Sequence, residues 1–200
     1  MNQTFIEVQQ ALLAALHHYD FDHVITDPKA FYVMTMENGL SGLIFSILDQ
    51  DKTHPELYLR LQRNHYDYVA RDVKQIEAIK SIDQLLSEKN IDHLFMKGSI
   101  LKFIYPETYM RGMGDIDLLI KDDMLERVHE IFKEVNIICT SHSKQHDVFE
   151  MPNGVVIEVH PMLYKPFNDH YQMIEEVWNH VHLEDKHRYR MNPEFELIYL

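Results

Sequence analysis

The chain has 200 residues, and 46% of them are hydrophobic, which is enough for a sizeable core and excludes a disordered protein. Nineteen basic residues against 32 acidic ones give a formal charge of −13, which disfavours binding to long DNA or RNA. No apolar run is long enough to span a bilayer and the first ten residues lack the pattern of a signal peptide, so we expect a cytoplasmic protein without a membrane partner.

Residues 1–90 have a helical pattern. Apolar residues recur at spacings of three and four along FIEVQQALLAAL and again along ENGLSGLIFSILDQ. The stretch that follows, up to Asn90, contains no proline or glycine after Pro55, a residue suited to the first turn of a helix. We therefore predict a helical N-terminal region, 1–90, that ends in a long amphipathic helix.

Beyond residue 90 the pattern alternates between strands and helices. DHLFMK and DIDLLI are typical of strands, whereas SILKFIY and DDMLERVHEIFKEV are typical of helical segments. HDVFEM and VVIEVHP flank the Asn153-Gly154 pair, which is a strong signal for a β-hairpin. The pattern predicts an α+β fold in which residues 91–200 form a core with a mixed sheet flanked by helices.

The C-terminal part predicts further helices. We expect one over residues 169–181 and another from Pro193 onward, where Asn192 is suited to the capping position. The chain stops on the apolar residues Ile198 to Leu200, so we expect additional helices beyond this end to cover them.

Two aspartates interrupt an otherwise apolar stretch, RGMGDIDLLI. Residues two apart on a strand point to the same face, so Asp115 and Asp117 project together. Neighbouring carboxylates repel each other unless a cation lies between them, and oxygen ligands of this kind suit Mg²⁺ or Mn²⁺. Glu158 in VVIEVHP is a third acid in an apolar strand, and it joins the same metal cluster if the two strands are neighbours. Alternatively, the two aspartates lie on a solvated edge strand.

The stretch MKGSILKF has the features of a phosphate site. A strand ends near Lys97, Gly98 allows close backbone approach, and Ser99 begins a helix whose free amides attract phosphate. Together with the acids, this stretch predicts a site for a metal and a phosphate.

The sequence resembles a bacterial group of nucleotidyltransferase family proteins in the polymerase-β-like superfamily. The stretches that carry the resemblance are LFMKGSILKFIYPETYMRGMGDIDLLI and, further along the chain, VVIEVHPMLY. The resemblance covers about residues 91–162. It implies a nucleoside triphosphate as substrate and transfer of its nucleoside monophosphate to a hydroxyl or amine of a small molecule or protein, with loss of pyrophosphate. The connector between Ser99 and Asp115 is longer than is usual in the superfamily.

The resemblance also implies roles for individual residues. Gly98 and Ser99 match the motif that holds the triphosphate, and Asp115 and Asp117 match the two metal-binding acids. Glu158 matches the third acid, which assists one metal and accepts the proton of the attacking hydroxyl.

Four further residues are candidates for the same site. Lys97, Lys102 and Arg111 are candidates for binding nucleotide phosphate. Alternatively, either lysine is a surface lysine and Arg111 is a solvated loop residue. His160 lies two residues after Glu158 and is a candidate for orienting the acid or the acceptor; a purely structural histidine is the alternative.

Two other interpretations remain open. A purely structural helical scaffold would account for residues 2–90 but leaves the buried acids unexplained. The chain could be a catalytically silent module of the same fold that binds a nucleotide or a partner protein, of a regulatory or toxin–antitoxin type.

The single cysteine, Cys139, excludes a CxxC zinc site, and we expect it to be a buried strand residue. The 14 histidines show no compact spacing typical of zinc ligands.

Overall fold

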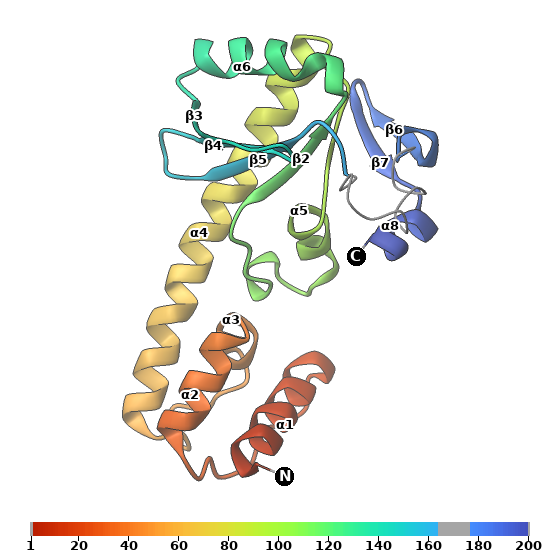
Figure 1. Ribbon diagram of the computed structural model, residues 1–200. Helices are drawn as coiled ribbons and strands as arrows, with labels where there is room; N and C mark the ends of the chain where they lie inside the picture. The colour runs from red at the N-terminus through yellow and green to blue at the C-terminus, as the bar shows by residue number, and fades with distance from the viewer. Residues whose placement is uncertain (1, 164–176, 200) are drawn as a thin grey trace. The chain divides into compact units, whose positions relative to one another are not determined.

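The structure, a computed structural model, describes residues 2–163 and 177–199 (Figure 1). These residues form two compact units. Unit 1 contains the residues up to Val73 and the segment Leu101–Gly112, and unit 2 contains Lys74–Ile100 and the described residues from Met113 onward. Helix α4 (Pro55–Glu88) contributes residues to both units. The expected division of the chain at residue 90 stays a prediction.

Unit 1 is helical, as the sequence predicts. The side chain of Asn2 accepts a hydrogen bond of 3.0 Å from the amide of Thr4 and so caps the first helix, and Asp27 caps the second in the same way. The long helix begins at Pro55, as predicted. The helices that precede α4 are α1 (Gln3–His17), α2 (Pro28–Glu37) and α3 (Ser41–Phe45). The buried core of these helices consists of Val8, Ala11, Phe31, Ile44, Leu57 and Leu61.

The helical pattern of ENGLSGLIFSILDQ is realised only in part. Helix α2 ends before Gly39, whose φ of +66° is a left-handed conformation that glycine adopts without strain. The following helix, α3, has only five residues. A turn at Gly39 therefore replaces the start of the longer helix that the apolar spacing suggests.

The segment Leu101–Gly112 carries a buried ion pair of unit 1. The Nζ atom of Lys102 lies 2.6 Å from Oδ1 of Asp72, and the Lys102 side chain is fully buried. The hydroxyl of Thr108 donates a hydrogen bond of 2.6 Å to the other oxygen of Asp72. The interpretation of Lys102 as a surface lysine is therefore wrong. The short 3₁₀ helices of this segment are η1 (Lys102–Ile104) and η2 (Thr108–Met110).

The described part of unit 2 is built on a seven-stranded mixed sheet with the order β3-β4-β5-β2-β1-β7-β6. Strands β2 and β5 are parallel neighbours, and so are β1 and β7, whereas the other pairs are antiparallel. The expected α+β fold is confirmed. The strands are β1 (His93–Phe95), β2 (Ile116–Ile120), β3 (Ile138–His142), β4 (Asp147–Glu150), β5 (Val156–His160), β6 (Val181–Asp185) and β7 (Arg188–Met191). Besides α4, the helical segments in the described part of this unit are α5 (Gly98–Leu101), η3 (Asp122–Met124), α6 (Leu125–Glu134), η5 (Val177–His180) and α8 (Pro193–Tyr199).

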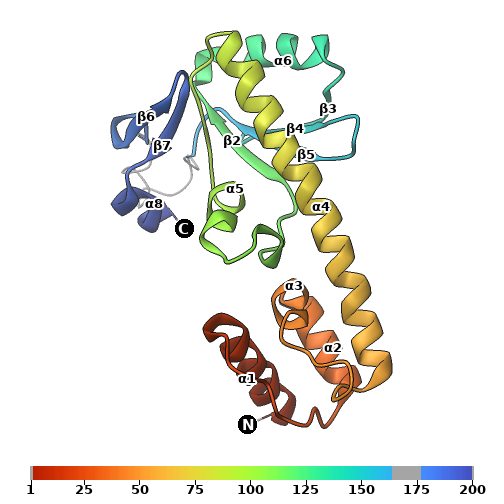
Figure 2. The same ribbon diagram turned by 180° about the vertical axis from the view of Figure 1, so that it is seen from behind.

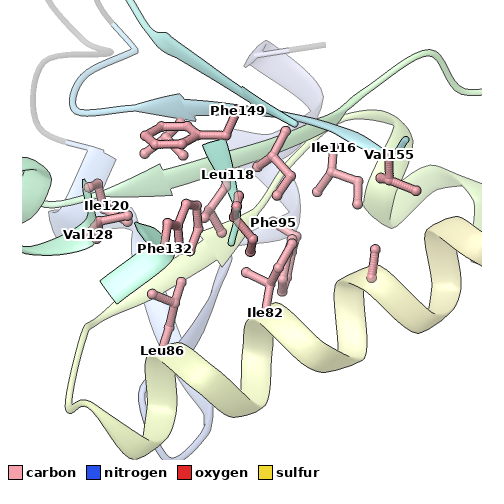
Figure 3. Close-up of a cluster of buried hydrophobic side chains, with 14 of the residues drawn as sticks. Ile82, Leu86, Phe95, Ile116, Leu118, Ile120, Val128, Phe132, Phe149 and Val155 are labelled. Carbon is pink, nitrogen blue, oxygen red and sulfur yellow. The ribbon is translucent and has the colours of Figure 1, made fainter. Parts of the chain in front are cut away.

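One face of the sheet packs against α4 and α6. Ile116, Leu118 and Ile120 of β2 lie in the same buried cluster as Ile82 and Leu86 of α4. Figure 3 shows these α4 side chains directed toward the strands, and the view from behind in Figure 2 shows α4 crossing this face. We call this face, which also carries Val128 and Phe132 of α6, the helix-covered face.

The opposite face carries a smaller apolar cluster next to polar residues. Leu94 of β1 and Leu119 of β2 pack with Phe195 of α8. Because strand residues alternate between faces, Asp117 shares this side of the sheet with Leu119. We call it the acidic face.

The predicted hairpin is present and joins β4 to β5. Gly154 has a φ of +80°, and its amide donates a hydrogen bond of 2.9 Å to the carbonyl of Met151. The side chain of Asn153 accepts a hydrogen bond of 3.1 Å from the amide of Val155. This turn aligns Val148 with Glu158 and Phe149 with Ile157 across the two strands.

The C-terminal part differs from the prediction. Most of the expected helix over 169–181 lies outside the described residues, but Val177–His180 is a 3₁₀ helix and Val181 begins strand β6. The hairpin β6–β7 was not expected from the sequence, and the helix predicted from Pro193 is present as α8. In the described ranges, no helix combines the length and the apolar character needed to cross a membrane.

Candidate active site

Two of the predicted acids face each other across neighbouring strands. Asp117 of β2 is the direct register partner of Glu158 of β5 in the parallel pair. Neighbouring strands lie about 4.8 Å apart, so the two side chains leave the sheet side by side on the acidic face. Asp117 is 5% exposed, whereas the side chain of Glu158 is 23% exposed. The sequence therefore brings together one buried and one accessible carboxylate.

Asp117 is held by two basic side chains. Its Oδ1 atom accepts a hydrogen bond of 2.7 Å from Nζ of Lys97 and lies 3.1 Å from Nε2 of His160. Burial alone would raise the pKa of Asp117, but the hydrogen bonds from His160 and Lys97 outweigh it and lower this pKa. Asp117 is therefore ionised throughout the neutral range.

Lys97 links this carboxylate to the end of strand β1. Its φ of +47° is in the left-handed region, where a residue with a side chain is uncommon. Burial alone would lower the pKa of Lys97, but the hydrogen bond to Asp117 and the interaction with Tyr199 of α8 raise it. The Lys97 side chain is still 42% exposed. It is therefore a charged group that both Asp117 and a ligand at this face can contact.

Glu158 lies between two histidines. Its carboxylate oxygens are 3.6 Å from Nε2 of His160 and 3.7 Å from Nε2 of His146. One ligand atom from each of the three residues falls within 4.8 Å of the others, which is a spacing that suits a metal ion. His146 was not assigned to the site from the sequence. The Asn153-Gly154 turn could have indicated it, because the register of this hairpin, extended by one residue beyond Asp147 and Val159, places His146 next to His160, and the two ring centroids lie 5.1 Å apart.

The first aspartate of the pair lies just outside the strand. Asp115 precedes β2 and is partly exposed. Among residues 2–163 and 177–199 it has no hydrogen bond or ion pair, and it belongs to neither of the two possible metal groups in those ranges. Strand alternation places it toward the acidic face with Asp117, so its role as a metal ligand stays a prediction.

The Gly-Ser stretch forms a tight turn at the end of β1. The amide of Ser99 donates to the carbonyl of Met96 at 3.1 Å, and the Ser99 hydroxyl lies 3.7 Å from the sulfur of Met113. Ser99 is only 1% exposed. Gly98 begins the four-residue helix α5 and is also buried. In this conformation the Ser99 hydroxyl is closed off from solvent, so its expected contact with a triphosphate stays a prediction.

Arg111 belongs to unit 1, whereas the other predicted site residues belong to unit 2. It is partly exposed and lies between η2 and Gly112. Its expected contact with nucleotide phosphate stays a prediction.

The expectation for Cys139 is wrong in one respect. Cys139 lies on a strand, β3, but this strand is at the edge of the sheet and the thiol is only partly buried. It lies close to His129, His142 and Asp147, a set that sequence spacing did not reveal.

Comparison with known proteins identifies the family. A family model described as "Uncharacterised nucleotidyltransferase" matches residues 25–200. No curated protein and no solved structure gives a match. The matched range includes most of the helical N-terminal region and the strands β6 and β7, and so extends well beyond residues 91–162. Since the match spans most of the chain, this protein belongs to that nucleotidyltransferase family.

Proposed function

We propose that this protein transfers a nucleoside monophosphate from a nucleoside triphosphate to a hydroxyl or amine of a small molecule or protein, releasing pyrophosphate. The observation that best supports the proposal is the pairing of Asp117 with Glu158 on neighbouring parallel strands, in a chain of a nucleotidyltransferase family. The formal charge of −13 makes a long nucleic acid an unfavourable acceptor.

The donor chemistry of the site fits Mg²⁺ or Mn²⁺. Asp115, Asp117 and Glu158 would hold the metal through carboxylate oxygens, which both ions prefer. Asp117 is buried and already held by the Lys97 ammonium, so its surroundings favour a positively charged partner. When bound, the metal stabilises charge on the attacking and leaving oxygens of the phosphoryl transfer.

Glu158 is the residue best placed to accept a proton. In the proposed reaction the acceptor oxygen attacks the α-phosphorus, the bond to the pyrophosphate oxygen breaks, and the hydroxyl proton passes to Glu158. Glu158 is more exposed than Asp117, and the rings of His146 and His160 hold it from two sides. Lys97, Gly98, Ser99 and Arg111 would bind the phosphates of the nucleotide.

Label transfer from nucleoside triphosphates tests the proposal. The protein is incubated with each of four α-labelled nucleoside triphosphates and Mg²⁺ or Mn²⁺, and both pyrophosphate release and label transfer are measured. We expect Asp117→Asn and Glu158→Gln each to lower the rate about 10²–10⁴-fold, because each removes a charge that acts in the transition state. A chelator should abolish the activity and added Mg²⁺ should restore it.

The matched control is Asp123→Asn, which removes an exposed carboxylate elsewhere in unit 2. It should leave the rate unchanged. Activity that survives in Asp117→Asn or Glu158→Gln would contradict the proposed site.

A catalytically silent nucleotide-binding module is the second candidate. The buried Ser99 hydroxyl and the ion pair between Lys97 and Asp117 favour it, because both engage groups that the transfer reaction would need. Nucleotide binding measured by calorimetry separates the two candidates. Metal-dependent binding that Asp117→Asn abolishes, with no pyrophosphate release by the wild type, would support the silent module.

A further inference from the structure

A second cluster of titratable side chains lies on the helix-covered face of the sheet. One ligand atom from each of His129, Cys139, His142 and Asp147 falls within 4.8 Å of the others. His129 comes from α6, Cys139 and His142 from the edge strand β3, and Asp147 from β4. Two imidazoles, a thiol and a carboxylate form a donor set that is typical of Zn²⁺.

A β-bulge brings the two β3 residues together. Residues three apart on a regular strand point to opposite faces, so Cys139 and His142 would normally diverge. The register of β3 against β4 shifts between Cys139 and Ser141, and this inserts one extra residue, Thr140. As a result Cys139 aligns with Phe149 and His142 with Asp147, both of which lie on one face of β4. Sequence spacing alone therefore gave no sign of this cluster.

The cluster is separate from the candidate active site. Phe149 belongs to the buried core under α4 and α6, so Asp147 and its partners lie on the helix-covered face. Glu158 pairs with Val148, which points to the other side of the sheet. A metal bound by this cluster is therefore distinct from one bound by Asp117 and Glu158.

The distances in the cluster are close to those of a tetrahedral zinc site. Asp147 Oδ2 lies 2.7 Å from Nε2 of His129 and 3.2 Å from Nδ1 of His142, and the Cys139 sulfur lies 3.7 Å from the same Nδ1 atom. Zinc–ligand bonds of 2.0–2.3 Å place tetrahedral donor atoms about 3.3–3.8 Å apart. Small side-chain movements would therefore replace the present hydrogen bonds with coordination bonds.

The cluster has one buried ligand and is open to solvent on its other side. The Asp147 side chain is only 8% exposed, whereas that of His142 is 69% exposed. A surface hollow lined by His129 and Cys139 also contains Glu126, Glu130 and Lys133 of α6, and the two carboxylates outnumber the single ammonium, which favours a cation. The site thus has one buried ligand, Asp147, and one exposed ligand, His142.

We propose that His129, Cys139, His142 and Asp147 form a structural zinc site that ties the edge strand β3 to β4 and helix α6. Binding converts the Cys139 thiol to a thiolate and releases its proton to solvent. The site closes all four positions of the metal with protein atoms, which is typical of a structural zinc site and unlike a catalytic one. Most residues of β3 are exposed, so little buried surface holds this strand in place and a metal link to β4 and α6 would stabilise it.

Cobalt substitution tests the proposal directly, because Cys139 is the only cysteine of the chain. The full-length protein is stripped with a chelator, kept reduced with a phosphine, and titrated with Co²⁺. We expect one equivalent to produce the visible bands of tetrahedral cobalt together with a thiolate-to-cobalt charge-transfer band. Zn²⁺ should then displace the cobalt and bleach both bands.

Variants separate this site from other metal sites and from a simple hydrogen-bond network. Cys139→Ser should abolish the charge-transfer band, and Asp147→Asn and His129→Gln should weaken Co²⁺ binding at least tenfold. The control His182→Gln removes an exposed histidine on β6 and should leave the spectrum unchanged. Zn²⁺ should also raise the midpoint of thermal unfolding of the wild type and of His182→Gln, but not that of Cys139→Ser.

Three results would overturn the proposal. These are the absence of a charge-transfer band in the wild type, a band that survives in Cys139→Ser, and a band that appears only together with a dimer in gel filtration. None of these measurements uses nucleotide turnover, so the outcome is independent of the proposed transfer activity.

Discussion

Asp117 is a buried carboxylate whose folded environment favours its charged form. Since its pKa is lowered in the folded chain, the ionised group stabilises the fold. This contribution is complete above the unfolded pKa of about 3.9 and is lost as the pH falls through the lower folded value.

This linkage predicts a pH-dependent effect of Asp117→Asn on stability. Near neutral pH we expect the substitution to lower the free energy of unfolding by about 1–3 kcal/mol, because it weakens a hydrogen bond to a charged group. The difference between wild type and variant should shrink below about pH 4. Urea unfolding across a pH series measures it, and a difference that stays constant into the acid range would contradict the assignment.

Lys102 makes the clearest prediction for the stability of unit 1. Removing one partner of a buried ion pair leaves the other charge without compensation. Lys102→Met should therefore lower the free energy of unfolding by about 3–5 kcal/mol, because Asp72 stays buried without its cation. Lys52→Met breaks an exposed pair with Asp22 and is the matched control. Denaturant unfolding should show a large shift of the midpoint for Lys102→Met and little for the control. Equal shifts would mean that burial of the Lys102 pair is not what stabilises unit 1.

The candidate site was only partly predictable from single residues. Asp117 and Glu158 stand out because each is an acid in an apolar strand, and this signal needs no knowledge of the fold. His146 gives no such signal, because it becomes a neighbour of Glu158 and His160 only through the pairing of β4 with β5. Ser99 was proposed because it begins a helix directly after a strand and Gly98, and Arg111 because its guanidinium suits phosphate; their contacts with nucleotide stay predictions.

At the scale of elements, the sequence predicted those helices and turns that depend on residues close together in the chain. Helix α4 follows from Pro55 and a long run without glycine, and the β4–β5 hairpin follows from Asn153 and Gly154. The hairpin β6–β7 was missed because Lys186, with a φ of +47°, takes a turn conformation that usually calls for glycine or asparagine. The bulge at Thr140 was missed because register shifts depend on the neighbouring strand.

The β4–β5 turn can be tested at its glycine. Gly154 has a φ of +80°, so Gly154→Ala should lower the free energy of unfolding by about 1–2 kcal/mol. Gly114→Ala is the matched control, because Gly114 does not have a left-handed φ and a Cβ there meets open space. Thermal unfolding of the two variants should differ by several degrees. A tolerated Gly154→Ala would show that the turn relaxes to another conformation.

At the scale of the whole molecule, the core of the sheet depends on residues that precede position 90. Ile82 and Leu86 of α4 are fully buried against the strands (Figure 3), and Ala78 belongs to the same buried cluster. Removing a buried Ile or Leu side chain lowers the free energy of unfolding by about 2–5 kcal/mol, and the sum over such residues is comparable with the free energy of unfolding of a whole domain.

We therefore expect a fragment of residues 91–200 not to fold cooperatively. Circular dichroism should show no sharp thermal transition for this fragment, whereas the full chain should show one. A cooperative transition in the fragment would instead support the sequence-based division at residue 90. The substitution Ile82→Ala in the full chain gives an independent measure of how much α4 stabilises the core.

The parallel pairing of β1 with β7 has a consequence for synthesis on the ribosome. His93 of β1 pairs with Arg188 of β7, and the chain between these two residues contains the five other strands of the described sheet. Until β7 emerges, β1 is a free edge with unpaired backbone groups, which is a template for association with other chains. The nascent protein thus carries a temporary aggregation-prone edge that only the last-made part of the sheet covers, and slowing translation shortly before Arg188 would prolong this exposure.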